Sequence, residues 1–563
     1  MTGVVGEPSG SHEFFGSSSA GSFMRQMQRA IDSRLGVGND NAGAGIVGVI
    51  SADGLSVTQR PFSTKPSIEY VLPPRKTADE LVHSYWELVY PLYPFLDRDS
   101  FQRFYESVWT GSGPGPAPDE SVLLCTMNVI FALGTQVSGT IEPEQRWEKA
   151  YTYFLRADHI REHDLRDNGS VSLVSCLLLM GIYLQSANIP QRCWMVVGHA
   201  IRMAQSLGLH LPDYNAPGRS LRGREVVRRI WHGCILMDRV LAMTFGRPAM
   251  IPKWLSAVVP LPSMIDDEFL DLQVEGSSIR PDNEPCIMEF YVSQLKLHDI
   301  MDNILLKLYM DHGGRQHPDV VTVFKLDEDL MNWTAGLSAE LQLDAPLKHR
   351  ESVRHRLAVV NRVRFFHARI LLLRPILAQF CLSHHAVRPI ESLASRMDIQ
   401  CSSLCLETAH RSIDLIYSHL NQDMVFGPVP AWWYSVLYVY TAATVLLAER
   451  IRPEIGTTIA QYSNVVSWRR AIQILKAYAR IGTSAKRCVA ALEILSAKIP
   501  AAHSSELLQA DDADPTVCTE PANPVPFPDS DLFSRVDLDG IFLDLDDMGW
   551  LQSGPEAWRT SMN

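Results

Sequence analysis

The sequence has no cysteine before Cys125, and its ten cysteines lie scattered from there to Cys518. Cys401 and Cys405 form the only short spacing among them. A disulfide framework or a cysteine-rich zinc module needs paired short spacings, so neither is predicted within this chain. The thiols are expected to be reduced, intracellular and mostly core-filling.

Long apolar runs are also scarce. The first thirty residues are rich in Gly and Ser and contain no apolar stretch, so no signal peptide is predicted. Residues 431–448 form an uncharged run of membrane-spanning length. This run stands alone, contains Ser and Thr, and is flanked by ordinary amphipathic segments. We therefore favour a buried central helix over a membrane span and expect no membrane partner.

Enzymatic signatures are weak. No phosphate-binding loop, dinucleotide glycine run or nucleophile elbow is found. His159 to His163 fit the H-x-x-E-H pattern of one zinc-peptidase class, but no third ligand can be placed. Residues 266–271, DDEFLD, miss the spacing of a magnesium-binding acidic motif because Leu270 occupies the third acidic position. We predict no enzyme, no catalytic or metal-binding residue and no cofactor.

Strand signals are almost absent, whereas apolar residues at helical spacing cover most of residues 71–500. The fold is predicted to be all-α, with one large helical domain at 71–500 between disordered N- and C-terminal tails. The N-terminal region, 1–70, is Gly/Ser-rich except for a short amphipathic helix at 22–35. That helix is expected either to dock on the body or a partner, or to remain frayed.

The stretch from Cys193 to Pro248 contains two clearly periodic helices. Trp194 and Trp231 belong to their apolar faces, and Gly198 would let another helix approach closely. Gly208 and Gly246 are placed to end the two helices in left-handed turns. Within the second helix, Glu225 and Arg229 have the spacing of an exposed ion pair.

Asp238 is the exception on the second helix, because it shares the buried face with Trp231. A buried carboxylate needs a partner. Arg247 and Arg202 are the candidates.

These motifs resemble the middle regulatory domain of fungal zinc-cluster transcription factors. The resemblance covers roughly residues 70–500 and includes residues 81–105, the acidic cluster after Leu261 and Pro262, and the two central helices. The motif residues on the central helices are Trp194, Gly198, Arg202, Gly208, Arg228, Arg229, Trp231, Asp238, Arg239, Gly246, Arg247 and Pro248. The resemblance implies a helical regulatory domain that controls activity and, in some members, binds small effectors. It also leaves a homodimer open.

Members of the resembled family usually begin with six cysteines that hold two zinc ions, followed by a basic linker. No such module is present here, so zinc would enter only if an upstream cluster were missing from the predicted gene. DNA contact is then expected only indirectly or through such a missing module. The basic stretch at 348–356 has two interpretations, an import signal or phosphate contact and a solvated helix face, and we favour the latter.

Charge is concentrated at the C-terminus. Residues 504–563 carry thirteen acidic residues against two arginines, a balance of −11, whereas the whole chain has a net charge of −12. Between 529 and 552, seven aspartates alternate with eleven bulky apolar residues. This composition is typical of disordered activation segments, whose apolar anchors enter a groove on a partner. We predict an acidic activation tail at 501–563, with anchors Phe542, Leu545 and Trp550, over a helix that docks back on the body.

The sequence therefore predicts a nuclear regulator of RNA polymerase II transcription. Its expected partners are a coactivator or the transcription machinery, through the tail, and other transcription factors. The alternatives are a helical interaction protein that modulates other regulators without touching DNA and, less well supported, an all-α metal-dependent enzyme.

Overall fold

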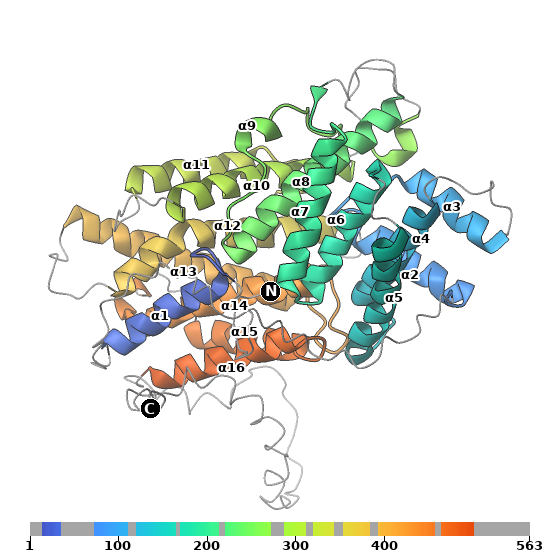
Figure 1. Cartoon of the computed structure of the whole chain (residues 1–563). Coiled ribbons are helices and arrows are strands. Elements are labelled where there is room, and N and C mark those ends of the chain that lie inside the picture. Colours follow the sequence, from blue (N-terminus) through green and yellow to red (C-terminus); the bar gives the residue numbers. More distant parts are fainter. Residues whose placement is uncertain are drawn as a thin grey trace, which may run out of the picture.

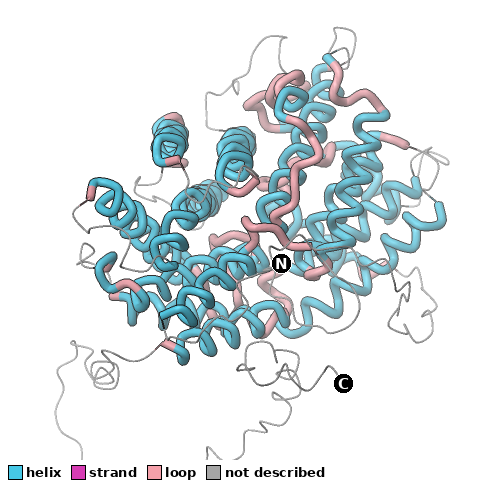
Figure 2. The backbone as a smooth tube through the Cα atoms, turned by 60° about the vertical axis from the view of Figure 1, so that its left-hand side comes forward, coloured by secondary structure: helices cyan, strands magenta, loops and turns pink. Residues whose placement is uncertain are grey.

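The computed structural model describes residues 14–34, 72–110, 120–164, 169–212, 220–271, 286–310, 319–342, 353–382, 392–456 and 463–499. Within these ranges the fold is helical, as predicted, and the only β pairing is an isolated bridge between Asn421 and Phe426 (Figure 2). The predicted disordered tails, including all of residues 501–563, lie outside the described residues except for the segment 14–34.

Sixteen α-helices make up the described fold. They are α1 (Ala20–Arg34), α2 (Arg75–Leu88), α3 (Arg98–Thr110), α4 (Glu120–Val137), α5 (Pro143–Asp164), α6 (Val171–Ser186), α7 (Pro190–Ser206), α8 (Leu221–Phe245), α9 (Lys253–Ser256), α10 (Met288–Leu308), α11 (Val320–Ala335), α12 (Val353–Leu382), α13 (Leu393–His419), α14 (Trp432–Ile451), α15 (Asn464–Tyr478) and α16 (Thr483–Lys498).

Local sequence sets several of these helix boundaries. Ser170 and Ser220 cap α6 and α8 by accepting hydrogen bonds from Leu173 N and Gly223 N, which satisfies donors that the first turn leaves free. Gly246 ends α8 with φ of 67°, a left-handed conformation that glycine adopts without steric cost. Gly208 has φ of 76° just after α7, so both predicted glycine stops are confirmed.

The helices form two packed groups. Helices α2–α8 gather on the right of Figure 1, and α10–α16 lie to the left of them and below. Neighbours in sequence pack against each other in both groups, for example α4 with α5 and α12 with α13, while α8 with α10 and α6 with α14 join the groups. One continuous apolar core runs through both.

Helix α1 packs mainly against helices from the C-terminal half of the chain. Helix α1 packs against α12 and α14 in the second group (Figure 1). Phe23, Met27 and Ile31, the predicted apolar face, are buried. The helix predicted at 22–35 is thus present and docks on the body, which decides between the two expectations for it.

The segment before α1 is also tied to the body. Gly16 N donates to Phe245 O at 2.8 Å, and Ser17 Oγ donates to Tyr309 O at 3.0 Å. Arg374 of α12 donates to Ser18 O. Residues 14–19 therefore connect the ends of α8 and α10 to α12.

Two described helices, α4 and α12, are long and apolar enough by composition to cross a membrane, yet 72% of each apolar stretch is buried inside the protein. Helix α14, which contains the uncharged run at 431–448, is buried along nearly its whole length. This burial is the arrangement expected of core helices.

Candidate functional site

The residues singled out in the sequence lie mainly on α7, α8 and the segment that follows α8. Trp231 is fully buried at the middle of α8, with its ring 5.8 Å from that of His210. Trp194 is partly buried, and the guanidinium of Arg247 stacks over its ring at 5.1 Å. Arg247 also donates to Phe14 O at 3.0 Å, so it links α7 to the N-terminal segment.

Asp238 pairs with no arginine among the described residues, and the prediction that Arg247 or Arg202 would hold it is wrong. Its carboxylate accepts backbone hydrogen bonds from Met250 N and Ile251 N, at 2.8 Å each for Oδ2. Burial raises the pKa of Asp238 to about 6, and these backbone donors limit the rise. The side chain fastens the chain after Pro248 back onto α8, while Arg202 is exposed.

The helical spacing of Glu225 and Arg229 predicts an exposed ion pair, but neither side chain is exposed in the structure. Both are buried, and the guanidinium of Arg229 pairs with Asp267 and donates to Ile265 O at 2.9 Å. Glu225 accepts from Ser263 N at 2.7 Å. Asp267, from the acidic cluster 266–271, is therefore one partner of a buried structural ion pair. Arg228, which is partly exposed, lies 3.7 Å from Glu225.

Gly198 was expected to allow a close helix approach, but a Cβ there would meet only Met250 Sδ at 3.6 Å, an ordinary contact. Closer approaches occur at three other helical glycines. A Cβ at Gly134 would lie 2.3 Å from Leu81 O, one at Gly181 would lie 2.6 Å from Val197, and one at Gly233 would lie 2.7 Å from Phe95. Glycines within apolar helical runs carry no signal of which neighbour they face, so the pattern could not identify these three positions.

The basic stretch at 348–356 is not a solvated face where it is described. His355 and Arg356 are buried at the start of α12, whereas Arg354 is partly exposed and lies 3.7 Å from Glu340. Residues 348–352 lie outside the described residues. Sequence reasoning missed the buried Arg356 because the surrounding charges suggested a solvated helix.

No group of His, Cys, Asp or Glu able to hold a metal ion occurs among the described residues. The side chain of His163, from the H-x-x-E-H pattern, is not among them.

Two hollows are candidates for binding sites. The first is a cleft of about 640 Å³ between α8, α10, α11 and residues 253–261, which we call the α8–α11 cleft. Arg239 on its wall pairs with Asp299 at 3.0 Å and donates to Ser256 Oγ at 3.1 Å. Lys253 also pairs with Asp299, at 3.3 Å. The volume is in the range of sites that bind small organic molecules.

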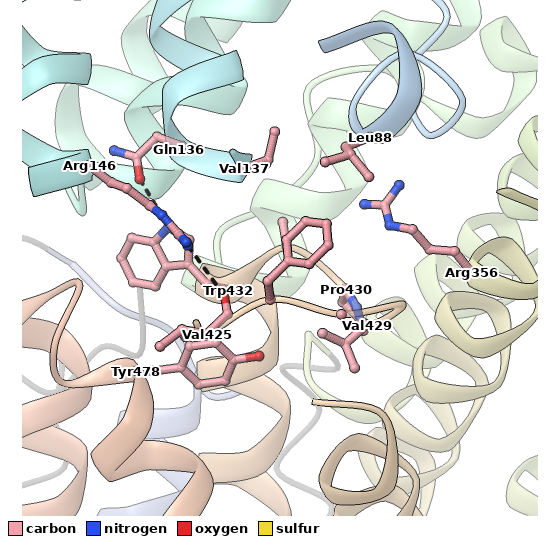
Figure 3. Close-up of a pocket in the computed structure, with 13 residues that line it drawn as sticks. Leu88, Gln136, Val137, Arg146, Arg356, Val425, Val429, Pro430, Trp432 and Tyr478 are labelled. Carbon is pink, nitrogen blue, oxygen red and sulfur yellow. Dashed lines mark hydrogen bonds between the residues drawn. The ribbon is translucent and has the colours of Figure 1, made fainter. Parts of the chain in front are cut away.

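The second hollow, which we call the seam pocket, lies where the two helix groups meet (Figure 3). It has a cavity volume of about 40 Å³. Its lining comes from α2, α4, α5, α12, α15, the chain before α14 and the first residue of α14. The lining residues are Leu88, Gln136, Val137, Arg146, Arg356, Val425, Phe426, Gly427, Val429, Pro430, Ala431, Trp432 and Tyr478.

A loop of the second group forms much of this pocket. Gln136 of α4 accepts a hydrogen bond from Trp432 Nε1 at 3.1 Å. Arg146 of α5 donates to Met424 O at 2.8 Å and to Val425 O at 3.3 Å. The 421–430 loop is therefore held by side chains of the first helix group.

Comparison with known protein families gives a match that runs from α2 to α11. Residues 82–335 match the fungal-specific transcription factor domain. Sorbicillinoid biosynthetic cluster transcription factor 2 of Penicillium rubens is 28% identical over 449 residues, which cover 76% of this chain and 61% of that protein. Sorbicillinoid biosynthetic cluster transcription factor sor3 of Hypocrea jecorina is 26% identical over 495 residues, covering 84% and 67%.

A third relative, Cutinase transcription factor 1 alpha of Fusarium vanettenii, is 27% identical over 283 residues, or 50% of this chain and 30% of its own length. The chain spans 61% of the length of its Penicillium relative. The matched range ends before the predicted body does, so the boundaries 71 and 500 stay a prediction. The resemblance inferred from the motifs is confirmed: residues 82–335 match the fungal-specific transcription factor domain, and the similar proteins are named as fungal transcription factors.

Proposed function

We propose that this protein is a nuclear regulator of RNA polymerase II transcription whose helical body controls the activity of its acidic tail. The match of residues 82–335 to the fungal-specific transcription factor domain carries the proposal. Relatives with several different names are all transcription factors or regulatory proteins. Because those names refer to different pathways, the proposal covers the class of activity and assigns no target genes.

The tail is proposed to recruit a coactivator or the transcription machinery. Its charge balance of −11 keeps bulky apolar residues solvated until they reach a partner with a basic, apolar groove. Charges mainly steer the encounter, whereas the buried apolar anchors supply most of the binding energy.

A tethering experiment tests the tail. Residues 501–563, fused to an unrelated DNA-binding domain, should activate a reporter in a fungal cell. Replacing Phe542, Leu545 and Trp550 by Ala should abolish activation without changing the charge. Replacing Asp544, Asp546 and Asp547 by Asn, the matched control, should weaken it less. A silent parent fusion, or an alanine variant as active as the parent, would remove the activation role.

DNA contact is proposed to be indirect, through other transcription factors, or to require a zinc-cluster module that this sequence does not contain. Outside residues 504–563 the chain carries 50 acidic and 49 basic residues, so its body offers no net charge for phosphates. The purified chain should give no footprint on DNA at physiological salt. A defined footprint at nanomolar concentration would reveal a binding surface and refute this part of the proposal.

The α8–α11 cleft is the proposed site for an organic effector of drug-like size. Its charged residues Arg239, Lys253 and Asp299 pair with one another, so a ligand there would have to compete with these internal ion pairs or bind beside them. Arg239→Ala in the full chain should weaken the response to such an effector if the cleft is the site. An unchanged response would place the effector elsewhere.

The alternative is a helical interaction protein that modulates other regulators and activates nothing itself. The near balance of 50 acidic and 49 basic residues outside 504–563 favours it, because the body offers no net charge for DNA phosphates. The full chain tethered to DNA distinguishes the two, because an activator raises reporter expression by itself and a modulator does so only with its partner regulator.

A further inference from the structure

A buried positive charge without a counter-charge stands at the wall of the seam pocket. Arg356 of α12 is 7% exposed, and its Nη1 atom has no hydrogen-bond acceptor among the described residues. None of the described residues that line the pocket carries a carboxylate. Burial lowers the pKa of Arg356 to about 10, so the guanidinium remains charged at neutral pH. An unpaired buried charge is costly, which makes this arginine a strong attractor for an anion.

The other buried arginines nearby are already used. Arg146, on the opposite side of the pocket in Figure 3, donates to Ile141 O at 2.9 Å as well as to the 421–430 loop. Arg364, two turns further along α12, donates to Gln294 Oε1 at 2.8 Å and to Tyr93 OH at 3.0 Å. Among the described residues, Arg356 is therefore the cationic group at this pocket with an unused donor. The neutral donors Gln136 Nε2 and Tyr478 OH, which belong to lining residues as well, also have no acceptor there.

The surroundings of Arg356 limit what can bind. Its guanidinium end points toward Leu88 (Figure 3), and Val429 and Pro430 also line the pocket. These neighbours are apolar, and the cavity of about 40 Å³ has room for roughly three water molecules. A ligand that fits has a small anionic head and at most a short aliphatic part.

We propose that the seam pocket binds a small monocarboxylate, of about the size of acetate or propionate. Its two oxygens would accept hydrogen bonds from the Arg356 guanidinium, whose planar fork matches a carboxylate. Its methyl or ethyl group would pack against Leu88 and Pro430. A dianion such as hydrogen phosphate is disfavoured, because only one guanidinium has free donors and the second negative charge would stay uncompensated in an apolar site.

The position of the pocket suggests what binding would do. Arg356 belongs to the second helix group, while Leu88 and Val137 on the opposite wall belong to the first. The 421–430 loop lies between them and takes a demanding conformation, since Val425 has φ of 49° and a Cβ at Gly427 would lie 2.2 Å from His419 O. A carboxylate would brace the two groups and this loop. That regulatory consequence rests on the proposed function, whereas the binding itself does not.

Calorimetric titration of the purified full chain tests the binding directly. Acetate and propionate should bind with a stoichiometry of one per chain. Acetamide, which has the same shape without the charge, and chloride at equal ionic strength should not bind. Tighter binding of phosphate than of acetate would overturn the assignment to a monocarboxylate, and no binding of any of these anions would overturn the site.

Arg356→Met tests the residue, because methionine keeps an unbranched apolar side chain of similar reach and removes the charge. The variant should lose about tenfold or more of the affinity for acetate. Without ligand it should melt at or above the temperature of the wild type, because the unpaired buried charge is gone. A merely structural arginine would instead give a lower melting temperature with affinity retained.

Arg354→Met on the same helix is the matched control. Arg354 is partly exposed, and the variant should bind acetate like the wild type. If both variants lose binding equally, the effect is general and the site is wrong. For the regulatory part, the tethered full chain should change reporter activity with acetate, and Arg356→Met should abolish that change. Binding in the calorimeter with an unresponsive reporter would refute the regulation and leave the site intact.

Discussion

Four buried histidines make the stability of this protein steeply dependent on pH. Burial lowers the pKa of His232 and His410 to about 4 and that of His298 and His367 to about 3, from an ordinary value of 6.5. The unfolded chain therefore takes up protons below pH 6.5 that the folded chain does not. Stability contributed by these groups is present above pH 6.5 and is lost as the pH falls toward the folded values.

The magnitude follows from these pKa values. Between pH 7 and pH 5, a histidine whose pKa falls from 6.5 to about 4 loses roughly 1.8 kcal/mol of folding free energy. Four such groups lose about 7 kcal/mol. Asp238 acts in the opposite direction, because its pKa is raised to about 6 and its protonation restores about 1.3 kcal/mol over the same range. Burial also raises the pKa values of Glu225 and Asp302, which oppose the histidines in the same way, so the net loss is at most about 6 kcal/mol. A loss approaching that size is comparable to the total stability of many domains.

Urea unfolding followed by far-UV circular dichroism at pH 7, 6 and 5 measures this loss. His232→Gln is the sharpest variant, because a glutamine amide can still donate to Val259 O and Pro260 O, which the imidazole contacts at 3.2 and 3.0 Å. It should lose about 1.8 kcal/mol less than the wild type between pH 7 and 5. His83→Gln, at an exposed position of α2, is the control and should follow the wild type. Parallel pH profiles for His232→Gln and the wild type would refute the reasoning.

Three further variants test other parts of the body by denaturation at pH 7. Trp231→Ala should cost about 3–5 kcal/mol, because it empties a fully buried site in α8; a loss below 1 kcal/mol would mean that the site collapses or is not buried. Asp238→Ala should cost about 2–4 kcal/mol, because it strands the N–H groups of Met250 and Ile251, and Asp238→Asn, which keeps one acceptor, should cost less. Equal losses would mean that hydrogen bonding is not what Asp238 provides. Gly246→Ala should cost about 2 kcal/mol and speed protease cleavage near residue 16, because φ is 67° and the new Cβ would lie 2.5 Å from Gly16 C; unchanged cleavage would argue against that contact.

Helical periodicity predicted the fold class and most of the helices, because apolar faces leave a direct trace in the sequence. The helices predicted at 22–35 and 431–448 are α1 and α14, each within three residues of its predicted ends. The helix ends at Gly208 and Gly246 could also be predicted, because glycine is the residue that most readily adopts the left-handed conformation at the end of a helix.

What the sequence could not show was which partners distant residues would meet. Asp238 is held by backbone N–H groups, which every residue possesses and which therefore leave no mark in a side-chain pattern. Glu225 and Arg229 satisfy the spacing rule for a surface pair, yet residues 263–267 cover them. Arg356 lies in a stretch of charges that resembles a solvated helix, and only the packing of α12 against the other helix group shows that it is buried.

The placement of α1 has a consequence for how the protein is made. Ser18 emerges from the ribosome 356 residues before Arg374, to whose guanidinium its carbonyl is bound. At ordinary rates of synthesis, about 5–20 residues per second, the interval is roughly 20–70 seconds. Throughout that time the apolar face of α1, with Phe23, Met27 and Ile31, has no site to enter, because α12 and α14 have not been synthesised. The nascent chain thus displays a hydrophobic segment long before its binding site is made, which suits this segment to capture by chaperones and makes docking of α1 a late event in folding.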